Sequence, residues 1–462
     1  MESRSLQYFR ERTVPVLSNF AAPAQEFFSS TILQAGHVEP AIKHMIIATA
    51  LLQEAIQCTP GQYSINRWYF GQHYSKAVAL LTGQGSNPSV GTVLMSCLLF
   101  LTCENFQGST MAGLLHIYSG LKILKDWKTS RRQKTIAAGS ADDLIENQID
   151  PLFARLEAQT SVYRSAYNTN HPFYSESPAR LQNIPSVPAS FKDLFLARDS
   201  LDEVMQWMFH ILDTEIYVTP DSSAVLPIRT LLDGWHLAFQ TYTTSLGDNN
   251  YLELRTASAL EIHYRILSIM LEVLSAETES VYDSYLSDFR ALVQQCEDII
   301  KYRESAPARS WAEYGDRMSL FEFDFGMIAP LFWIACHCRD PALRRKAIRL
   351  MRYLHRTEGA WDGCSAGKIA ESIMEIEERG LTVIQSCHYI TENSRIRAIN
   401  ADIDPAHPSR VILSFCHSPY EAIEQELISW ASWSRSELES RTLWVSLPSN
   451  QCEMNSTLLT FK

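Results

Sequence analysis

Apolar and polar residues recur along much of the chain with the spacing of an α-helix. The clearest example is residues 341–356, where one helical face is apolar and a second face, about 200° away, carries arginines. The apolar positions are Leu343, Ala347, Leu350 and Leu354, and the arginines are Arg345, Arg349, Arg352 and Arg356. Asp340 and Pro341 come directly before, as is typical of a capped helix start. We therefore predict an amphipathic helix that packs through its leucines and exposes its arginines.

The segments beside this helix are also predicted to be helical. Met327–Ala335 is almost wholly apolar, which predicts a buried helix. Residues 368–379 predict another helix, with isoleucines inward and glutamates outward. The inward residues are Ile369, Ile373 and Ile376, and the outward residues are Glu371, Glu375 and Glu378. Gly359 is interpreted as the stop signal of the arginine-bearing helix.

The remaining periodicity predicts the fold class. We expect helices near 40–56, 74–81, 93–104, 112–124, 191–212, 226–244, 252–274 and 289–301, and a short one near 144–156. Residues 410–415 fit a strand and 419–433 fit a last helix. The predicted class is all-α: a large irregular helical domain of about ten helices, with at most one or two short strands near the C-terminus.

Composition divides this predicted domain into four parts. Residues 1–125 form the N-terminal helical part, and 126–190, which include a stretch rich in Ser, Asn, Pro and Tyr, form a variable connection. Residues 191–380 form the helical core, and 381–462 form a C-terminal extension in which the pattern weakens.

Charge and cysteine usage narrow the function classes. The formal net charge of −12 and pI of about 5.6 argue against nucleic-acid binding by this chain alone, because phosphate contacts need a basic surface. No signal peptide and no apolar run of about 20 residues is visible, so we expect an intracellular protein. The ten cysteines form no CxxC pair, which is typical of reduced, buried thiols.

One short pattern is typical of serine hydrolases. Gly363, Ser365 and Gly367 fit G-x-S-x-G, in which the serine lies on a strand-to-helix elbow of an α/β sheet. The predicted surroundings here are helical. We therefore favour a glycine-rich loop with Ser365 near a helix start.

A second pattern is typical of magnesium-dependent enzymes. Asp142, Asp143 and Glu146 have the DDxxE spacing with which terpene synthases hold Mg²⁺ ions that bind diphosphate. The sequence has no second metal motif of that class, so we favour a solvated acidic helix start. An all-α metal-dependent enzyme of the terpene-synthase type stays as the alternative function.

Other candidate features have a structural interpretation. On a helix, Cys336 and Cys338 lie about 200° apart and cannot share an ion with His337. The arginine face is expected to lie opposite acidic helices at 371–378 and 421–425. The basic run 125–134, a candidate nuclear import signal, is favoured as a solvated loop. The apolar residues of 321–333 are favoured as core over a ligand pocket.

The stretch 318–380 is similar to a known family. The run FxFxxGMIAPLFWIACHCRDPALRRKAIRLM, followed by HRTEGAWD, resembles the fungal-specific transcription factor domain. This domain is the regulatory half of fungal zinc-cluster transcription factors, including sterol uptake control regulators. The matching residues are Phe323, Gly326, Pro330, Leu331, Cys338, Arg339, Asp340, Pro341, Arg344, Arg345, Ala347, Ile348, Leu350, Glu358, Gly359 and Trp361. The resemblance covers most of residues 1–380.

The resemblance implies a transcription regulator without a reaction of its own. It implies no catalytic residue, no metal ligand and no cofactor; zinc is expected only with an upstream six-cysteine cluster, a pattern that these residues do not contain. The matching residues that we expect to be structural motif residues are Cys338, Arg339, Asp340, Pro341, Arg344, Arg345, Glu358, Gly359 and Trp361. The residues of any ligand site stay unknown.

The resemblance also implies how such a regulator would act. Expected partners are other transcription regulators or coactivators, with a small apolar ligand as a further candidate. DNA would be reached only indirectly or through an N-terminal module missing from this sequence. A homodimer and a heterodimer are both open, and no membrane is expected. The expected location is the nucleus, with the cytoplasm as the alternative. A degenerate scaffold without DNA binding is the remaining interpretation.

Overall fold

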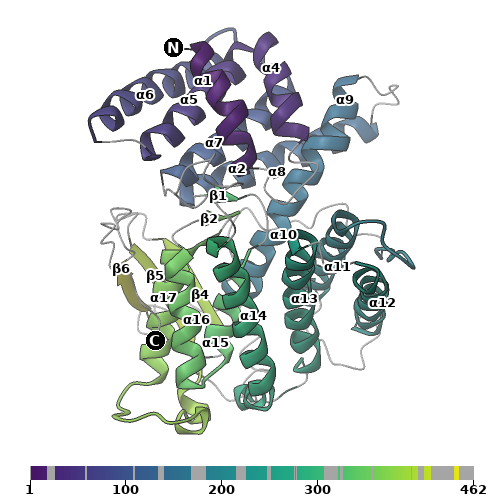
Figure 1. Cartoon of the computed structure of the whole chain (residues 1–462), viewed down its shortest axis with the longest axis vertical. Helices are drawn as coiled ribbons and strands as arrows, with labels where there is room; N and C mark the ends of the chain where they lie inside the picture. Colours follow the sequence, from purple (N-terminus) through teal and green to yellow (C-terminus); the bar gives the residue numbers. More distant parts are fainter. Residues whose placement is uncertain are drawn as a thin grey trace.

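A computed structural model gives the arrangement of the chain (Figure 1). It describes residues 2–17, 26–57, 60–107, 110–133, 140–167, 184–214, 225–246, 251–274, 276, 278–305, 321–322, 326–354, 357–359, 361–396, 398–403, 410–417 and 442–446. The described part is mainly helical, so the predicted all-α class is confirmed. The helix predicted over 419–433 and the acidic segment at 421–425 lie outside the described residues.

The N-terminal helices gather at one end of the molecule (Figure 1). They are α1 (Glu2–Tyr8), α2 (Val14–Leu17), α4 (Ile32–Val38), α5 (Pro40–Gln57), α6 (Pro60–Thr82), α7 (Val90–Phe106) and α8 (Thr110–Gln133), with single π-turns at η1 (Phe9–Thr13) and η2 (Phe27–Thr31). Helix α5 packs against α6 and α7. It buries the face predicted from its spacing, including Ile42, Met45 and Leu52.

The middle of the chain runs from the N-terminal end to the opposite end. Its elements are α9 (Ser140–Leu144), η3 (Ile145–Ile149), α10 (Asp150–Tyr167), α11 (Leu194–Thr214), α12 (Val225–Thr244) and α13 (Tyr251–Glu272). Figure 1 shows α10 connecting the two ends. The sequence predicted only one short helix near 144–156 in this region. The structure has more helix there, because α8 and α10 together make much of 126–167 helical.

The C-terminal helices pack side by side with the second sheet beside them (Figure 1). They are η5 (Glu279–Tyr285), α14 (Leu286–Ser305), α15 (Ile328–His337), α16 (Pro341–Leu354), α17 (Gly363–Glu377), η6 (Cys387–Tyr389) and η7 (Glu392–Ser394). Helix α16 has its predicted start, since Asp340 Oδ1 accepts from the amides of Ala342 (3.1 Å) and Leu343 (2.9 Å).

Strands are more numerous than predicted. The first sheet joins β1 (Phe321–Glu322) in parallel to β2 (Thr357–Glu358), which pairs antiparallel with β3 (Trp361–Asp362). The second sheet is antiparallel, with the order β4 (Ala398–Ile403), β5 (Arg410–Cys416) and β6 (Thr442–Ser446). The strand predicted at 410–415 is confirmed. The structure adds β4 and β6, which the sequence did not predict, and three two-residue strands that are too short to leave a period in the sequence.

Two apolar clusters fill the described part of the chain. The larger one runs from the N-terminal helices through α13–α17, so the two ends of the molecule share one core. The smaller one lies among α11, α12 and α13 and centres on Trp235. The indole Nε1 of Trp235 donates to the Ala197 carbonyl at 2.7 Å, and its ring stacks on Phe239 with centroids 4.5 Å apart. No helix among the described residues is both long and apolar enough to cross a membrane.

Candidate functional site: a buried network of ion pairs around Arg339

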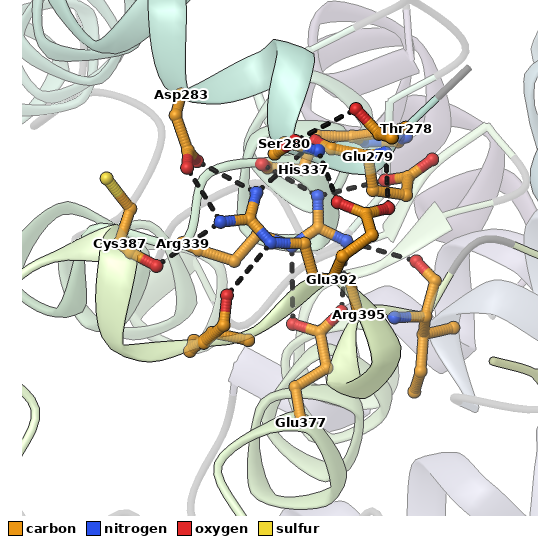
Figure 2. Close-up of polar contacts among 12 residues, drawn as sticks. Thr278, Glu279, Ser280, Asp283, His337, Arg339, Glu377, Cys387, Glu392 and Arg395 are labelled. Carbon is orange, nitrogen blue, oxygen red and sulfur yellow. Dashed lines mark hydrogen bonds and ion pairs between the residues drawn. The ribbon is translucent and has the colours of Figure 1, made fainter. Parts of the chain in front are cut away.

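Arg339 lies at the centre of the C-terminal half, directly after α15 ends. Its side chain is fully buried, as is that of Glu377 at the end of α17. Arg339 Nη2 donates to Glu377 Oε1 at 2.9 Å, and Nη1 donates to Glu279 Oε2 at 3.0 Å. The guanidinium also donates to the carbonyls of His337 and Ile396, each at 3.0 Å. These contacts join four segments that are far apart in sequence (Figure 2).

Glu377 is shared between two arginines. Besides Arg339, its Oε2 lies 2.7 Å from Nη1 of Arg344, whose Nε donates to the Ala335 carbonyl at 2.8 Å. Its Oε1 also accepts from the Ile396 amide at 2.6 Å. Burial favours the neutral acid, but Arg339 and Arg344 outweigh it and lower the pKa of Glu377 to about 2. Glu377 is therefore a buried carboxylate that is charged at neutral pH.

Glu279 is the less stabilised carboxylate of the network. Burial raises its pKa, against the lowering effect of Arg339. Burial likewise opposes the charge of Arg339, but Glu377 and Glu279 together raise the pKa of that guanidinium. Since a lone charge is very costly in a protein interior, each member of the network depends on the others.

A second group of contacts attaches residues 387–396, which we call the C-terminal clasp, to η5. Arg395 donates to both carboxylate oxygens of Asp283, with Nη1 at 3.0 Å and Nη2 at 2.6 Å. The same guanidinium donates to the carbonyls of Ile390 (3.1 Å) and Cys387 (3.3 Å). Glu392 accepts from the amide of Glu279 at 2.7 Å and caps η5. The clasp thereby connects the first turn of η5 to the end of α17 (Figure 2).

The turn between β2 and β3 forms a separate contact centre. The Glu358 carboxylate, 2% exposed, accepts from the Ile328 amide at 2.8 Å and caps α15. Gly359 has a φ of +57°, and a Cβ there would overlap the Gln159 side chain. Trp361 Nε1 donates to the Gln159 carbonyl at 3.4 Å. Gly359 therefore lies in this turn and does not end α16, which corrects its predicted place.

The backbone carbonyl of Gly359 also forms a hydrogen bond with the N-terminal half of the chain. Asn105 Nδ2 on α7 donates to the Gly359 carbonyl at 3.4 Å. The β2–β3 turn thus contacts α7 and α10 at the junction of the two ends of the molecule. The buried polar residues of 326–361, such as Arg339, Arg344 and Glu358, lie at internal junctions, where they position helices.

The exposed arginine face has the surroundings that its interpretation predicted. Arg345 forms a bidentate pair with Glu378, and Arg352 pairs with Glu371, with Nη2 to Oε2 at 2.6 Å. Lys368 lies 2.9 Å from the same Glu371 oxygen. Two arginines of the row, Arg345 and Arg352, are thus paired with glutamates on or directly after α17, which is the solvated arrangement expected of a polar face. Arg349 is exposed, and Arg356 lies outside the described residues.

The two enzyme-like patterns occupy ordinary structural positions. Asp362 Oδ1 accepts from the Ser365 amide at 2.7 Å, so Gly363–Gly367 is the capped first turn of α17. Asp143 and Glu146 are exposed, and Glu146 pairs with Arg131 from α8. The acidic pattern at 142–146 is therefore on the surface and bound to a cation of the chain itself.

The Cys336–Cys338 segment is packed into the core. Burial raises the thiol pKa of Cys336 and of Cys338 to about 12. The His337 ring stacks on Trp333 with centroids 4.7 Å apart, and its Nδ1 lies 2.8 Å from the Trp333 carbonyl oxygen. Burial and the nearby Arg339 lower the His337 pKa to about 3, so this ring is neutral.

The described residues of the basic run 125–134 and of the apolar run 321–333 also form contacts within the chain. Lys128 pairs with Asp150 at 2.7 Å, and Arg131 lies over the Trp127 ring at 5.3 Å. The run is partly helical, since α8 continues to Gln133, and this differs from the predicted loop.

In the apolar run, Phe332 packs against Trp361 with ring centroids 5.3 Å apart. Phe323–Phe325 lie outside the described residues.

The sequence analysis did not predict most ion pairs of the network, although the positions of two members, Glu377 and Arg344, indicate that they are buried. Glu377 is four residues after Ile373, and Arg344 is three before Ala347, so both occupy inward positions of their helices. A charge on the apolar face of each of two neighbouring helices predicts a buried pair. Asp283 and Arg395 left no such signal, because they lie in short irregular segments.

Comparison with known proteins gives one related protein. No protein-family model matches the chain, and no solved structure matches it. The chain is similar to the aspercryptin biosynthesis cluster-specific transcription regulator atnN of Emericella nidulans. The two are 20% identical over 475 residues, which cover 84% of this chain and 75% of that protein. The similarity points to a fungal transcription regulator.

Proposed function

We propose that this chain is a transcription regulator of the fungal zinc-cluster type that acts through its helical domain. The observation that carries the proposal is the similarity to a cluster-specific transcription regulator along 84% of the chain. The resemblance of residues 318–380 to the fungal-specific transcription factor domain points the same way. The genes it controls would be those of a metabolic pathway, and it would act in the nucleus.

The proposed mechanism is binding of a protein partner, with a small apolar ligand as a second possible effector. A partner or ligand that favours one packing of the helices would shift the population toward an active form. The buried network around Arg339 would stabilise one of these packings, because its ion pairs join α15, α16, α17 and the clasp. DNA would be reached through a zinc-cluster module, either of a partner or joined to this chain.

The enzyme alternative has weaker support. Its carboxylates at 142–146 are on the surface, and Glu146 is paired with Arg131. A metal-dependent enzyme of the terpene-synthase type would need these groups around an apolar cavity. We therefore favour a non-catalytic role, and the degenerate scaffold remains the outcome if no transcript responds.

The test is deletion of the gene, followed by transcript and metabolite profiling. We expect the messenger RNA of a limited group of genes to fall several-fold, and the chain with Arg352→Ala, a surface change, to restore it. The chain with Glu377→Ala, which breaks the buried network, should fail to restore it. A deletion that changes one metabolite but leaves all transcripts unchanged would support the enzyme and overturn the regulator.

A further inference from the structure

A set of metal-binding side chains lies at the outer edge of the C-terminal clasp. Asp283 comes from η5, and Cys387 and His388 come from η6, more than a hundred residues later. One donor atom from each of these three residues lies within 4.8 Å of the other two. Figure 2 shows Asp283 and Cys387 flanking the Arg395 guanidinium. The proposed function does not use these residues.

We propose that Asp283, Cys387 and His388 bind one zinc ion, which joins η5 to the clasp. A thiolate, an imidazole and a carboxylate are the three side-chain types that ligate Zn²⁺ in proteins, with water as a fourth ligand at an open site. Mg²⁺ and Ca²⁺ prefer oxygen ligands alone, so the thiol and imidazole favour zinc. The inference concerns metal binding itself and goes beyond the proposed regulatory function.

The three donor atoms need to move together by only about 1 Å to reach the spacing of a zinc site. Ligand bonds of about 2.0–2.3 Å place neighbouring donor atoms about 3.3–3.8 Å apart. His388 Nδ1 lies 3.9 Å from Asp283 Oδ2, and the Cys387 Sγ lies within 4.8 Å of a donor atom of each of these residues. The His388 side chain is 80% exposed, so its ring is free to rotate toward the ion, and the ion can enter from solvent.

The ion pair with Arg395 is compatible with this site. Each carboxylate oxygen of Asp283 accepts one hydrogen bond from Arg395 and keeps a second lone pair for a metal. Carboxylates that bind metals are commonly hydrogen-bonded in this way, which orients them. Binding converts the Cys387 thiol to a thiolate and releases its proton to solvent, so the added negative charge offsets the ion.

The clasp gives the site a structural consequence. The carbonyl of Cys387 accepts from Arg395, whose neighbour Ile396 contacts Glu377. An ion held between η5 and η6 therefore reinforces the contacts that attach the clasp to the buried network. Zinc binding should raise the melting temperature of the chain, because a ligand that binds only the folded state stabilises it.

The experiment is a titration of the full, reduced, metal-free chain with Co²⁺, a spectroscopic substitute for Zn²⁺. We expect one ion per chain, a thiolate-to-cobalt charge-transfer band, and displacement of Co²⁺ by Zn²⁺. Cys387→Ser should abolish the band, and His388→Ala should weaken binding at least tenfold. Cys364→Ser, a cysteine outside the clasp on α17, is the matched control and should bind as the unchanged chain does.

Three outcomes would overturn the site. These are no band in the unchanged chain, a band that survives Cys387→Ser, or a band lost equally in Cys364→Ser. The far-ultraviolet circular dichroism of each variant shows that it is folded. Asp283 is left unchanged, because its loss would also release Arg395. Metal binding is measured without any transcript, so its failure is distinct from failure of the regulatory proposal.

Discussion

The same two helices carry two sets of arginine–glutamate pairs that differ in their surroundings. On the outer face of α16 and α17, Arg352 pairs with Glu371, and these side chains are 41% and 24% exposed. On the inner face, Arg344 pairs with Glu377, and both side chains are fully buried. The two kinds of side chain are the same, and both pairs join α16 to α17. Exposure alone makes the outer pairs weak and makes the inner pairs interdependent.

The comparison shows what each set contributes. Water screens the outer pairs, so removal of one partner leaves a solvated charge. The inner pairs have no water to replace a lost partner, so they allow only one arrangement of the segments that they join. The inner set is therefore suited to hold α15, α16, α17 and the clasp in register, and the outer set to keep the surface soluble.

The largest effect is expected from Glu377→Ala. The change leaves Arg339 and Arg344 buried beside one another without their shared carboxylate. Breaking a buried pair costs about 3–5 kcal/mol, and urea unfolding should show a loss of that size. An unfolding midpoint equal to that of the unchanged chain would contradict the account of the network.

The second effect is a loss of stability in acid. The folded pKa of Glu377 is lowered from its ordinary value of 4.5 to about 2. Its contribution is therefore fully present above pH 4.5 and is lost as the pH falls through about 2, by about 3 kcal/mol in total. Glu279 acts in the opposite sense, because its pKa is raised. Urea unfolding across this pH range should show a slope that Glu377→Gln reduces; an equal slope in both proteins would exclude Glu377 as its source.

The third effect concerns the clasp. Arg395→Ala removes the bidentate pair with Asp283 and the donors to Ile390 and Cys387. Hydrogen bonds to charged groups contribute about 1.5–3 kcal/mol, and we expect a loss of about 2 kcal/mol, since Asp283 is partly solvated. Limited proteolysis should cut near residues 387–396 faster in this variant. Unchanged cleavage there would show that other contacts hold the clasp.

The sequence predicts the ion pairs between regular helices better than the ion pairs between short irregular segments. Periodicity located α16 and α17 and predicted that the arginine face of α16 lies opposite the acidic residues of 371–378, because regular helices repeat every turn. The same periodicity also indicates the inner pair, since Arg344 and Glu377 each occupy a position on the apolar face of their helix. It could not locate Asp283 and Arg395, because the short segments around them have no period and their meeting depends on tertiary packing.

The fourth effect tests the contact centre beside the inner pairs. Gly359→Ala places a Cβ in a left-handed backbone conformation and against the Gln159 side chain. The conformation costs about 1–2 kcal/mol, and the overlap adds to it. Thermal unfolding should show the loss. Gly380→Ala is the matched control, because its φ is +83° but a Cβ there would meet open space. Equal losses in both variants would mean that backbone strain alone matters at Gly359.

The smallest effect is expected on the outer face. Arg352→Ala removes a pair with Glu371 that Lys368 can partly replace, because Lys368 Nζ lies 2.9 Å from the same oxygen. Exposed pairs contribute about 0.2–1 kcal/mol, and the loss should shrink further at high salt because ions screen the pair. Unfolding at low and high salt measures both quantities. A loss as large as that of Glu377→Ala, or one that salt does not change, would mean that the outer face is not solvated and that the two sets differ in something other than exposure.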